Sequence, residues 1–230
     1  MAVKTVKASI NGQEYTLTYD ESSGSYKATI TAPSKSSYNN NDGHYYPVSV
    51  TATDDAGNST TVTDTDATFG DDLKLKVKEK VKPTIAVTYP TDSATITSAT
   101  PTITWTVTDD DSGIDEATIA IKIDSGTYVT SGITTTATTK GFNCSYKVPT
   151  SLSNGAHSFS LKVSDHDGNA ATEVVTSFTV DTVPPALTIS SPADGLITNN
   201  ETLTVSGTTN DVTSTPVTVT VNGTPVTVQT

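Results

Sequence analysis

The chain has 230 residues, of which 33% are hydrophobic, 6% aromatic and 17% charged, a composition that favours several small cores over one large core. The formal net charge is −12, and every one of the 13 basic residues is a lysine. A nucleic-acid partner requires a basic surface, preferably with arginine for bidentate phosphate contacts, so the composition excludes nucleic acid as a partner.

Strand patterns begin close to the N-terminus and continue along the chain. Threonine, valine and isoleucine dominate, and no window shows the apolar spacing of an amphipathic helix, so essentially no helix is expected. Asn11-Gly12 is a type I′ turn signal, and it predicts a hairpin between residues 6–10 and 15–19. A second turn at residues 22–24 leads to a predicted strand over residues 26–30.

Lysines mark the strand that is predicted next, from residue 73 onward. Leu73, Leu75 and Val77 are expected to face inward. The lysines of the opposite face are Lys74, Lys76, Lys78, Lys80 and Lys82. Lysines on a sheet edge discourage aggregation between strands, and the alternative is a docking surface for an acidic partner.

Residues 82–182 are predicted to fold as seven strands around an apolar core, with a short strand near Tyr128. Trp105, the sole tryptophan, is expected at the centre of this core. Cys144, the sole cysteine, can form no intramolecular disulfide and is expected to be buried rather than reactive. The residues expected to face inward are Ile85, Val87, Tyr89, Ile103, Trp105, Val107, Ile119, Ile121, Ile123, Phe142, Cys144, Tyr146, Val148, Phe159, Leu161, Val163, Val174 or Val175, Phe178 and Val180.

Two sequence signatures occur twice. Residues 83–90 and 185–192 each hold an alternating strand between two prolines. The hairpins at residues 54–58 and 165–169 both have aspartate at the first position, glycine at the fourth and asparagine at the fifth. The strand and the hairpin frame a repeat of about 100 residues, which is the usual size of a β-sandwich domain.

Residues 183–230 hold only about half of the next repeat. Strands are expected near Leu187, Ile197 and Leu203 and over residues 217–221. Asn222-Gly223 is a turn signal, and a strand over residues 226–228 is expected to follow it. Two sheets must face each other to bury a core, so this segment is expected to be an incomplete domain.

Four motifs carry a resemblance to a known family. They are WTVTDDDSGID at residues 105–115, LSNGAH at 152–157, DHDGN at 165–169 and VDTVPP at 180–185. At these motifs the chain resembles the bacterial Ig-like repeat family of surface proteins and phage structural proteins. The resemblance implies an all-β chain of tandem immunoglobulin-like β-sandwiches without significant helix. The expected domains are sandwiches at residues 1–81 and 82–182 and a truncated sandwich at residues 183–230.

The opening domain and the sequence LKLKVKEK at residues 73–80 also look like Ig-like proteins encoded in tail regions of phages that infect Gram-positive gut bacteria. This second resemblance implies a non-enzymatic virion protein of the tail, a structural or decorating protein with weak adhesion to host glycans. The sequence shows no signal peptide and no membrane-spanning stretch, which agrees with a virion location and with no membrane insertion. The implied partners are other virion proteins or host cell-wall polysaccharide.

Two alternatives stay open: the stalk of a bacterial surface adhesin, at the cell surface or secreted, and an accessory module of a secreted polysaccharide hydrolase. Catalysis is not expected. The three histidines are His44, His157 and His166, and none belongs to a catalytic motif or to a cluster with zinc spacing.

Acidic loops are the candidate metal site, and calcium is the one cofactor considered. Aspartate and asparagine supply the hard oxygen ligands that calcium prefers. The candidate ligands are Asp109, Asp110, Asp111, Asp165, Asp167 and Asn169. The alternative is that these residues serve the turns alone, because tight turns require aspartate, glycine and asparagine.

The loop at residues 34–46 is the candidate site for glycan contact. Aromatic rings can stack on sugar faces while amide groups bond to hydroxyls. The candidate contacts are Tyr38, Asn40, His44, Tyr45 and Tyr46. The alternative is that the tyrosines cap the open end of a core with their hydroxyls bonded to the backbone.

Overall fold

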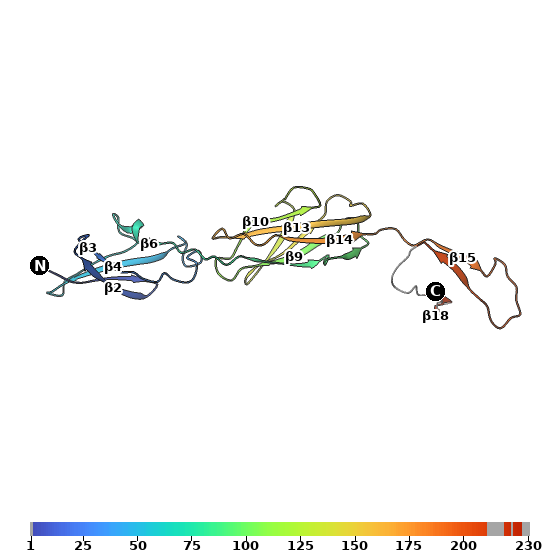
Figure 1. Cartoon of the computed structure of the whole chain (residues 1–230), viewed down its shortest axis with the longest axis horizontal. Helices are drawn as coiled ribbons and strands as arrows, with labels where there is room; N and C mark the ends of the chain where they lie inside the picture. The colour runs from blue at the N-terminus through green and yellow to red at the C-terminus, as the bar shows by residue number, and fades with distance from the viewer. Residues whose placement is uncertain (1, 211–218, 222, 227–230) are drawn as a thin grey trace. The chain divides into compact units, whose positions relative to one another are not determined.

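The chain folds almost entirely as β-strands, as Figure 1 shows. The computed structural model describes residues 2–210, 219–221 and 223–226. The expected all-β fold is confirmed, since the helical segment in this part of the chain is one 3-10 turn, η1 (Gly70–Leu73). Residues 1–181 form one compact unit and residues 182–230 form a second. The three domain ranges expected from the sequence stay predictions.

Six strands form the N-terminal sheet, in the order β3-β2-β1-β4-β5 with β6 paired to β4. The strands are β1 (Val3–Ile10), β2 (Gln13–Asp20), β3 (Ser25–Lys27), β4 (Tyr46–Asp54), β5 (Ser59–Val62) and β6 (Lys74–Leu75). The predicted hairpin at Asn11-Gly12 is confirmed. Both turn residues have positive φ, 50° and 75°, which a type I′ turn requires. The turn places Ile10 opposite Gln13 and so fixes the register of β1 on β2.

Two strands of this sheet are shorter than the sequence predicts. The strand expected over residues 26–30 ends at Lys27. The strand expected from residue 73 is reduced to Lys74–Leu75, which pairs with β4. Beyond it, Val77 exchanges hydrogen bonds with Ser37: the Val77 carbonyl accepts from the Ser37 amide, and the Val77 amide donates to the Ser37 hydroxyl. The chain therefore leaves the sheet and runs beside the loop that contains Ser37.

Eight further strands form two four-stranded sheets, in the orders β10-β13-β14-β8 and β11-β12-β9-β7. We call this pair of sheets the β7–β14 sandwich. Its strands are β7 (Thr84–Tyr89), β8 (Ala94–Ile96), β9 (Thr102–Thr108), β10 (Ile114–Ile123), β11 (Ile133–Thr138), β12 (Gly141–Lys147), β13 (Gly155–Asp165) and β14 (Val174–Val180).

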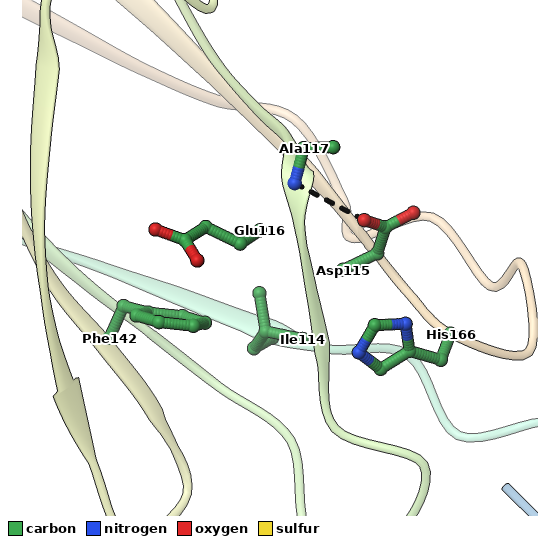
Figure 2. A pocket seen from close by; sticks show the side chains of 6 residues that line it. All are labelled: Ile114, Asp115, Glu116, Ala117, Phe142 and His166. Carbon is green, nitrogen blue, oxygen red and sulfur yellow. Dashed lines mark hydrogen bonds between the residues drawn. The ribbon is translucent and has the colours of Figure 1, made fainter. Parts of the chain in front are cut away.

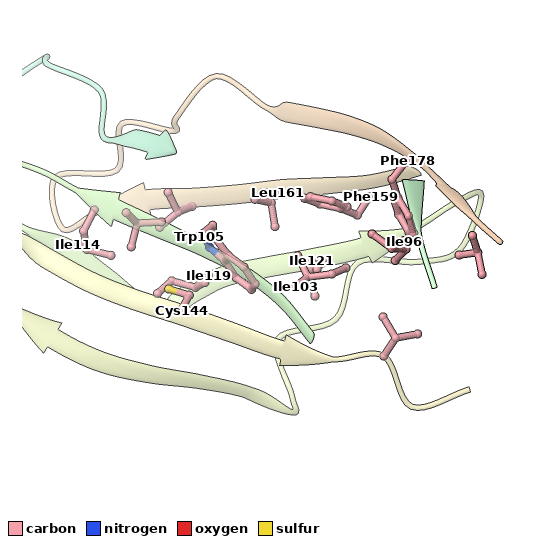
Figure 3. Packing of buried hydrophobic residues seen from close by; sticks show 14 residues of the cluster. Ile96, Ile103, Trp105, Ile114, Ile119, Ile121, Cys144, Phe159, Leu161 and Phe178 are labelled. Carbon is pink, nitrogen blue, oxygen red and sulfur yellow. The ribbon is translucent and has the colours of Figure 1, made fainter. Parts of the chain in front are cut away.

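The side chains that both sheets turn inward form one core, shown in Figure 3. Trp105 on β9 is 1% exposed and packs in this core with Ile121 and Leu161 of the opposite sheet. Cys144 is buried as expected, and desolvation raises the pKa of its thiol to about 11. The alternating pattern therefore identified the interior of the sandwich.

One residue of the expected core is exposed, one of the two alternatives Val174 and Val175 is decided for Val174, and the short strand expected near Tyr128 is reduced to an isolated bridge at Val129. Tyr89 is 44% exposed. The pairing of β7 with β9 shifts register between Val87 and Tyr89, and this shift turns the Tyr89 side chain away from the core. Val175 is 61% exposed, because the inward alternation of β14 runs through Thr176, Phe178 and Val180. Tyr128 lies outside any strand and donates a 2.5 Å hydrogen bond to Glu173.

The second unit contains two small hairpin sheets, one of β15 (Leu187–Ser191) with β16 (Ser206–Thr209) and one of β17 (Val219–Val221) with β18 (Thr224–Val226). The strand expected near Leu187 is confirmed. The strand expected near Ile197 is wrong, since Ile197 lies outside any strand and is 95% exposed. The strand expected near Leu203 begins three residues later, as β16. The expectations for residues 217–218, 222 and 227–228 fall outside the described residues.

We expect Leu161→Ala to lower the free energy of unfolding of the β7–β14 sandwich by about 2–5 kcal/mol, because Leu161 is fully buried and its removal leaves a cavity. Urea unfolding followed by Trp105 fluorescence measures this change. Val175→Ala, on the exposed face of the neighbouring strand, serves as the control and should change it by less than about 0.5 kcal/mol. Equal losses in the two variants would contradict the described packing.

A second prediction concerns pH and His157. Its Nδ1 lies 2.8 Å from an Asp124 carboxylate oxygen and its Nε2 lies 2.9 Å from the Ser153 carbonyl oxygen. The bond to Asp124 is the main cause that raises the His157 pKa above its usual value. The stabilisation by His157 is therefore complete below the pKa of the unfolded chain and is lost as pH rises through the pKa of the folded chain.

We expect His157→Ala to destabilise the sandwich more at pH 5 than at pH 8.5, measured by urea unfolding. In an Asp124→Asn background, the destabilisation by His157→Ala at pH 5 should differ less from that at pH 8.5. A destabilisation that is independent of pH in both backgrounds would contradict the assignment of the charged hydrogen bond.

Candidate functional site

The loop at residues 109–113 is built around one carboxylate at the end of β9. Asp109 Oδ1 accepts hydrogen bonds from the backbone amides of Asp111 and Gly113, at 2.9 and 2.8 Å. Gly113 has a φ of 84°, a conformation that favours glycine. The aspartate and the glycine are thus both required by the turn.

The hairpin at residues 165–169 is held by a similar device. Asp165 accepts hydrogen bonds from the backbone amide and the side-chain amide of Asn169, both at 2.8 Å. Asp54 accepts the same pair of bonds from Asn58, at 2.9 and 3.0 Å. The repeated sequence signature therefore folds into the same hairpin twice. Turn chemistry accounts for this aspartate and asparagine at both places.

Residues 36–39 contact the loop at 109–113. The Asp111 carboxylate accepts the backbone amide of Ser36 at 3.2 and 3.1 Å. The Asn39 side-chain amide donates to the carbonyl oxygens of Asp111 and Ser112, at 2.6 and 3.2 Å. These bonds join residues that are more than 70 positions apart in the sequence.

The segment at residues 77–81 contacts the same end of the sandwich. The Glu79 amide donates to the Asp167 carboxylate at 2.9 Å, and the Lys78 ammonium donates to the Asp167 carbonyl oxygen at 3.0 Å. The Asn169 side-chain amide donates to the Glu79 carbonyl oxygen at 3.2 Å. We call residues 36–39 and 77–81, together with the loops 109–113 and 165–169, the junction.

Three aromatic rings are stacked at the junction, of which Tyr38 and His166 belong to it and His44 lies outside it. The Tyr38 ring lies between the rings of His44 and His166, with centroid distances of 4.1 and 4.0 Å and interplanar angles of 5° and 7°. Both faces of the Tyr38 ring are therefore covered by side chains of the protein itself.

Three carboxylates meet in the buried part of the junction: Glu79, Asp109 and Asp165, which are 8%, 8% and 2% exposed. Each offers an oxygen, and these oxygens lie within 4.8 Å of one another. Desolvation raises the pKa of Glu79, and the negative charges of Asp109 and Asp165 raise it further. In the part of the chain that the structure describes, no salt bridge joins these three carboxylates to a lysine.

The structure separates the six candidate calcium ligands into groups. Asp109 and Asp165 belong to the buried cluster, and Asn169 donates to Asp165. Asp111 and Asp167 each accept a backbone amide across the junction. Asp110 is exposed and forms a 2.6 Å ion pair with Lys140, which lowers its pKa.

Glu79 is not among the candidate residues that the sequence indicated. A signal for it exists, because Glu79 continues the inward alternation of Leu73, Leu75 and Val77. A carboxylate at an inward position, in a segment whose other charges are all lysines, is the pattern that could have identified it.

The candidate residues for glycan contact largely stack on or form hydrogen bonds with other residues of the protein. Tyr38 has no free ring face. Tyr46 is buried, and its hydroxyl donates to the Lys35 carbonyl oxygen at 3.3 Å. Tyr45 donates to Asp64 at 2.9 Å, which raises its pKa, and its carbonyl oxygen accepts from Asn40 at 2.8 Å. Tyr46 fits the alternative in which a tyrosine hydroxyl bonds to the backbone, whereas the Tyr45 hydroxyl bonds to a side chain.

An open depression of about 490 Å³ lies beside the junction and is shown in Figure 2. The residues that line it are Ile114, Asp115, Glu116, Ala117, Phe142 and His166. Asp115 and Glu116 are consecutive, and Figure 2 shows their carboxylates on opposite sides of the strand. Asp115 accepts the Ala117 amide at 3.2 Å, and Glu116 accepts the Thr135 hydroxyl. They therefore do not face each other as the carboxylate pair of a glycosidase does.

Comparison with known families assigns most of the chain. Residues 2–71 match a family model described as a bacterial Ig-like domain, and residues 83–161 match one described as a bacterial Ig domain. The chain carries bacterial Ig-like domains. Residues 185–230 match a model described as glucodextranase, domain B. Of the Ig-like regions, the first supplies residues 36–39 of the junction and the second supplies the loop at 109–113.

Solved structures with some similarity include fibronectin(III)-like modules of CbhA from Clostridium thermocellum, at 20% identity over 77% of this chain and 78% of that chain, with a TM-score of 0.33. CopC from Methylosinus trichosporium OB3b is 20% identical over 43% of this chain and 94% of that chain, with a TM-score of 0.31. Dimeric latent PorU from Porphyromonas gingivalis is 17% identical over 80% of this chain and 20% of that chain, with a TM-score of 0.38. No match was found among the curated proteins. The described residues include no helix that is both long and apolar enough for a membrane span.

Proposed function

We propose that the chain is a non-enzymatic structural module in which the first two Ig-like regions act as one coupled unit. The observation that carries this proposal is the junction. Hydrogen bonds from residues 36–39 and 77–81 reach two loops of the β7–β14 sandwich, and the Tyr38 ring stacks on His166. Relative motion is the default for domains in one chain unless their interface opposes it.

The junction opposes such motion because the groups that meet in it are also held by hydrogen bonds within their own loops. Asp109 and Asp165 fix their own loops with hydrogen bonds inside the sandwich. Those loops then present Asp111 and Asp167 to backbone amides on the other side. Each such bond contributes on the order of 1 kcal/mol, and several of them act together. A coupled pair of this kind suits a spacer or a decorating module that keeps attached parts at a defined separation.

The setting that we propose for this module is the tail or surface of a virion, with other virion proteins or host cell-wall polysaccharide as partners. The resemblance of the opening domain and of residues 73–80 to Ig-like proteins of phage tail regions supports it. The match of residues 185–230 to glucodextranase domain B favours a second setting, an accessory module of a secreted polysaccharide hydrolase. A non-catalytic structural role is common to both settings.

Double electron–electron resonance tests the coupling. Spin labels at Thr16→Cys and Val175→Cys occupy exposed positions in the N-terminal sheet and in the sandwich, and the buried Cys144 thiol stays unlabelled. We expect a narrow distance distribution, measured with calcium and with chelator. Tyr38→Ala should broaden it, because the ring stack across the junction is lost.

Tyr26→Ala is the matched control, since it removes a ring contact with Tyr19 inside the N-terminal sheet and should leave the distribution unchanged. A broad distribution of spin-label distances in the chain with an unmutated junction, both with calcium and with chelator, would overturn the proposal of a coupled unit.

Sedimentation with isolated Gram-positive cell walls tests the choice between a spacer and an adhesin. We expect no saturable binding through the loop at residues 34–46, because Tyr38 and Tyr46 are engaged within the protein. The half-exposed Tyr45 is the remaining candidate ring of this loop. Saturable binding that Tyr45→Ala abolishes would contradict a pure spacer role and establish a glycan site.

A further inference from the structure

We infer that Glu79, Asp109 and Asp165 form a calcium site inside the junction. The inference rests on the proposed coupling, because it names an ion that would hold the two sides of the junction together. Glu79 comes from the segment that follows the N-terminal sheet, whereas Asp109 and Asp165 come from the ends of β9 and β13.

The separation of the three carboxylates fits one shared ion. Calcium binds oxygen at 2.3–2.6 Å, so two of its ligands can lie at most about 5 Å apart. The three carboxylate oxygens lie within 4.8 Å of one another. This separation is close to the one that three oxygens around a common calcium ion require.

An unpartnered oxygen points to a ligand independently of the clustering. Asp109 is more than nine-tenths buried, and its Oδ1 already accepts two backbone amides. Its Oδ2 is inaccessible to solvent and has no hydrogen-bond partner among the described residues. A buried carboxylate oxygen without a partner is costly, and a bound cation at this position would remove that cost.

The charge balance leads to the same conclusion. Three carboxylates lie together with little exposure, and the structure gives them hydrogen-bond donors but no lysine partner in its described part. Buried charges in proteins are normally paired or bind metal ions. A divalent cation would compensate most of this charge.

The remaining bonds of the carboxylates hold them in orientation. Glu79 accepts the Val81 amide at 2.6 Å and the Ser112 hydroxyl at 3.2 Å. Asp165 accepts both amides of Asn169. Such outer contacts fix the orientation of metal ligands and are typical of metal sites. The hairpin of Asp54 has the same asparagine bonds but is exposed at its turn, and among the described residues Asp54 belongs to no group of three carboxylates, so it serves as an internal control.

Calcium is the ion that this ligand set favours. The three ligands are all carboxylates, whereas zinc prefers cysteine and histidine. Magnesium demands octahedral geometry at 2.0–2.1 Å and retains several water molecules, which suits an open site rather than a buried cluster. Calcium tolerates irregular geometry and accepts several carboxylates together.

Isothermal titration of the chelator-treated full chain with calcium chloride tests the site. We expect saturable binding, and an increase of the unfolding temperature with calcium concentration, because an ion that binds only the folded state stabilises it. Glu79→Gln should weaken calcium binding at least about 10-fold while Trp105 fluorescence shows that the sandwich stays folded. Asp54→Asn, the matched control, should leave calcium affinity unchanged.

Three outcomes would overturn the inference: no calcium binding by the folded chain, binding that Glu79→Gln leaves unchanged, or magnesium binding that equals calcium binding. The two proposals fail separately. A narrow spin-label distribution in chelator together with no calcium binding leaves the coupled unit in place and removes the calcium site. A broad spin-label distribution with calcium and with chelator, together with calcium binding that depends on Glu79, removes the coupled unit and leaves the calcium site in place.

Discussion

Carboxylate oxygens that accept backbone amides shape the loops at the ends of β9 and β13. Asp109 closes one loop and Asp165 the other, and each does so with bonds inside its own turn. Strands alone would leave these ends undefined, because the ladder hydrogen bonds stop where the chain turns. Residues 36–39 and 77–81 bond to loops that also have hydrogen bonds of their own. Local turn chemistry thus determines the long-range contacts of the molecule.

The core and the junction are stabilised in different ways. The β7–β14 sandwich is held by apolar burial around Trp105, Phe159 and Phe178, which requires only that inward positions be apolar and of suitable size. The junction is held by hydrogen bonds and one ring stack, which require defined positions of donors and acceptors. Changes in the core therefore affect stability first, whereas changes in the junction affect the coupling of its two sides.

Sequence reasoning identified the core far better than the candidate site. Period-two alternation is a local property, so Trp105, Leu161 and Cys144 could be placed inside from neighbouring residues alone. It failed at Tyr89, where a register shift against β9 depends on pairing that the sequence does not display. It failed again at Ile197, where the apolar pattern alone did not produce a strand. The aspartates of the loops were visible, but their meeting with Glu79 depends on how distant segments pack.

The paired hairpins of Asp54 and Asp165 have a consequence for how such chains evolve. The bonds that the aspartate of each hairpin accepts from the asparagine lie within five residues of the chain. Duplication of a domain therefore places a copy of the complete loop at a second position in the chain. In one copy the loop stays exposed in solvent, and in the other it meets a neighbouring segment and becomes part of a contact. A change in the adjoining segment can therefore add or remove a contact between neighbouring domains without a change in the hairpin itself.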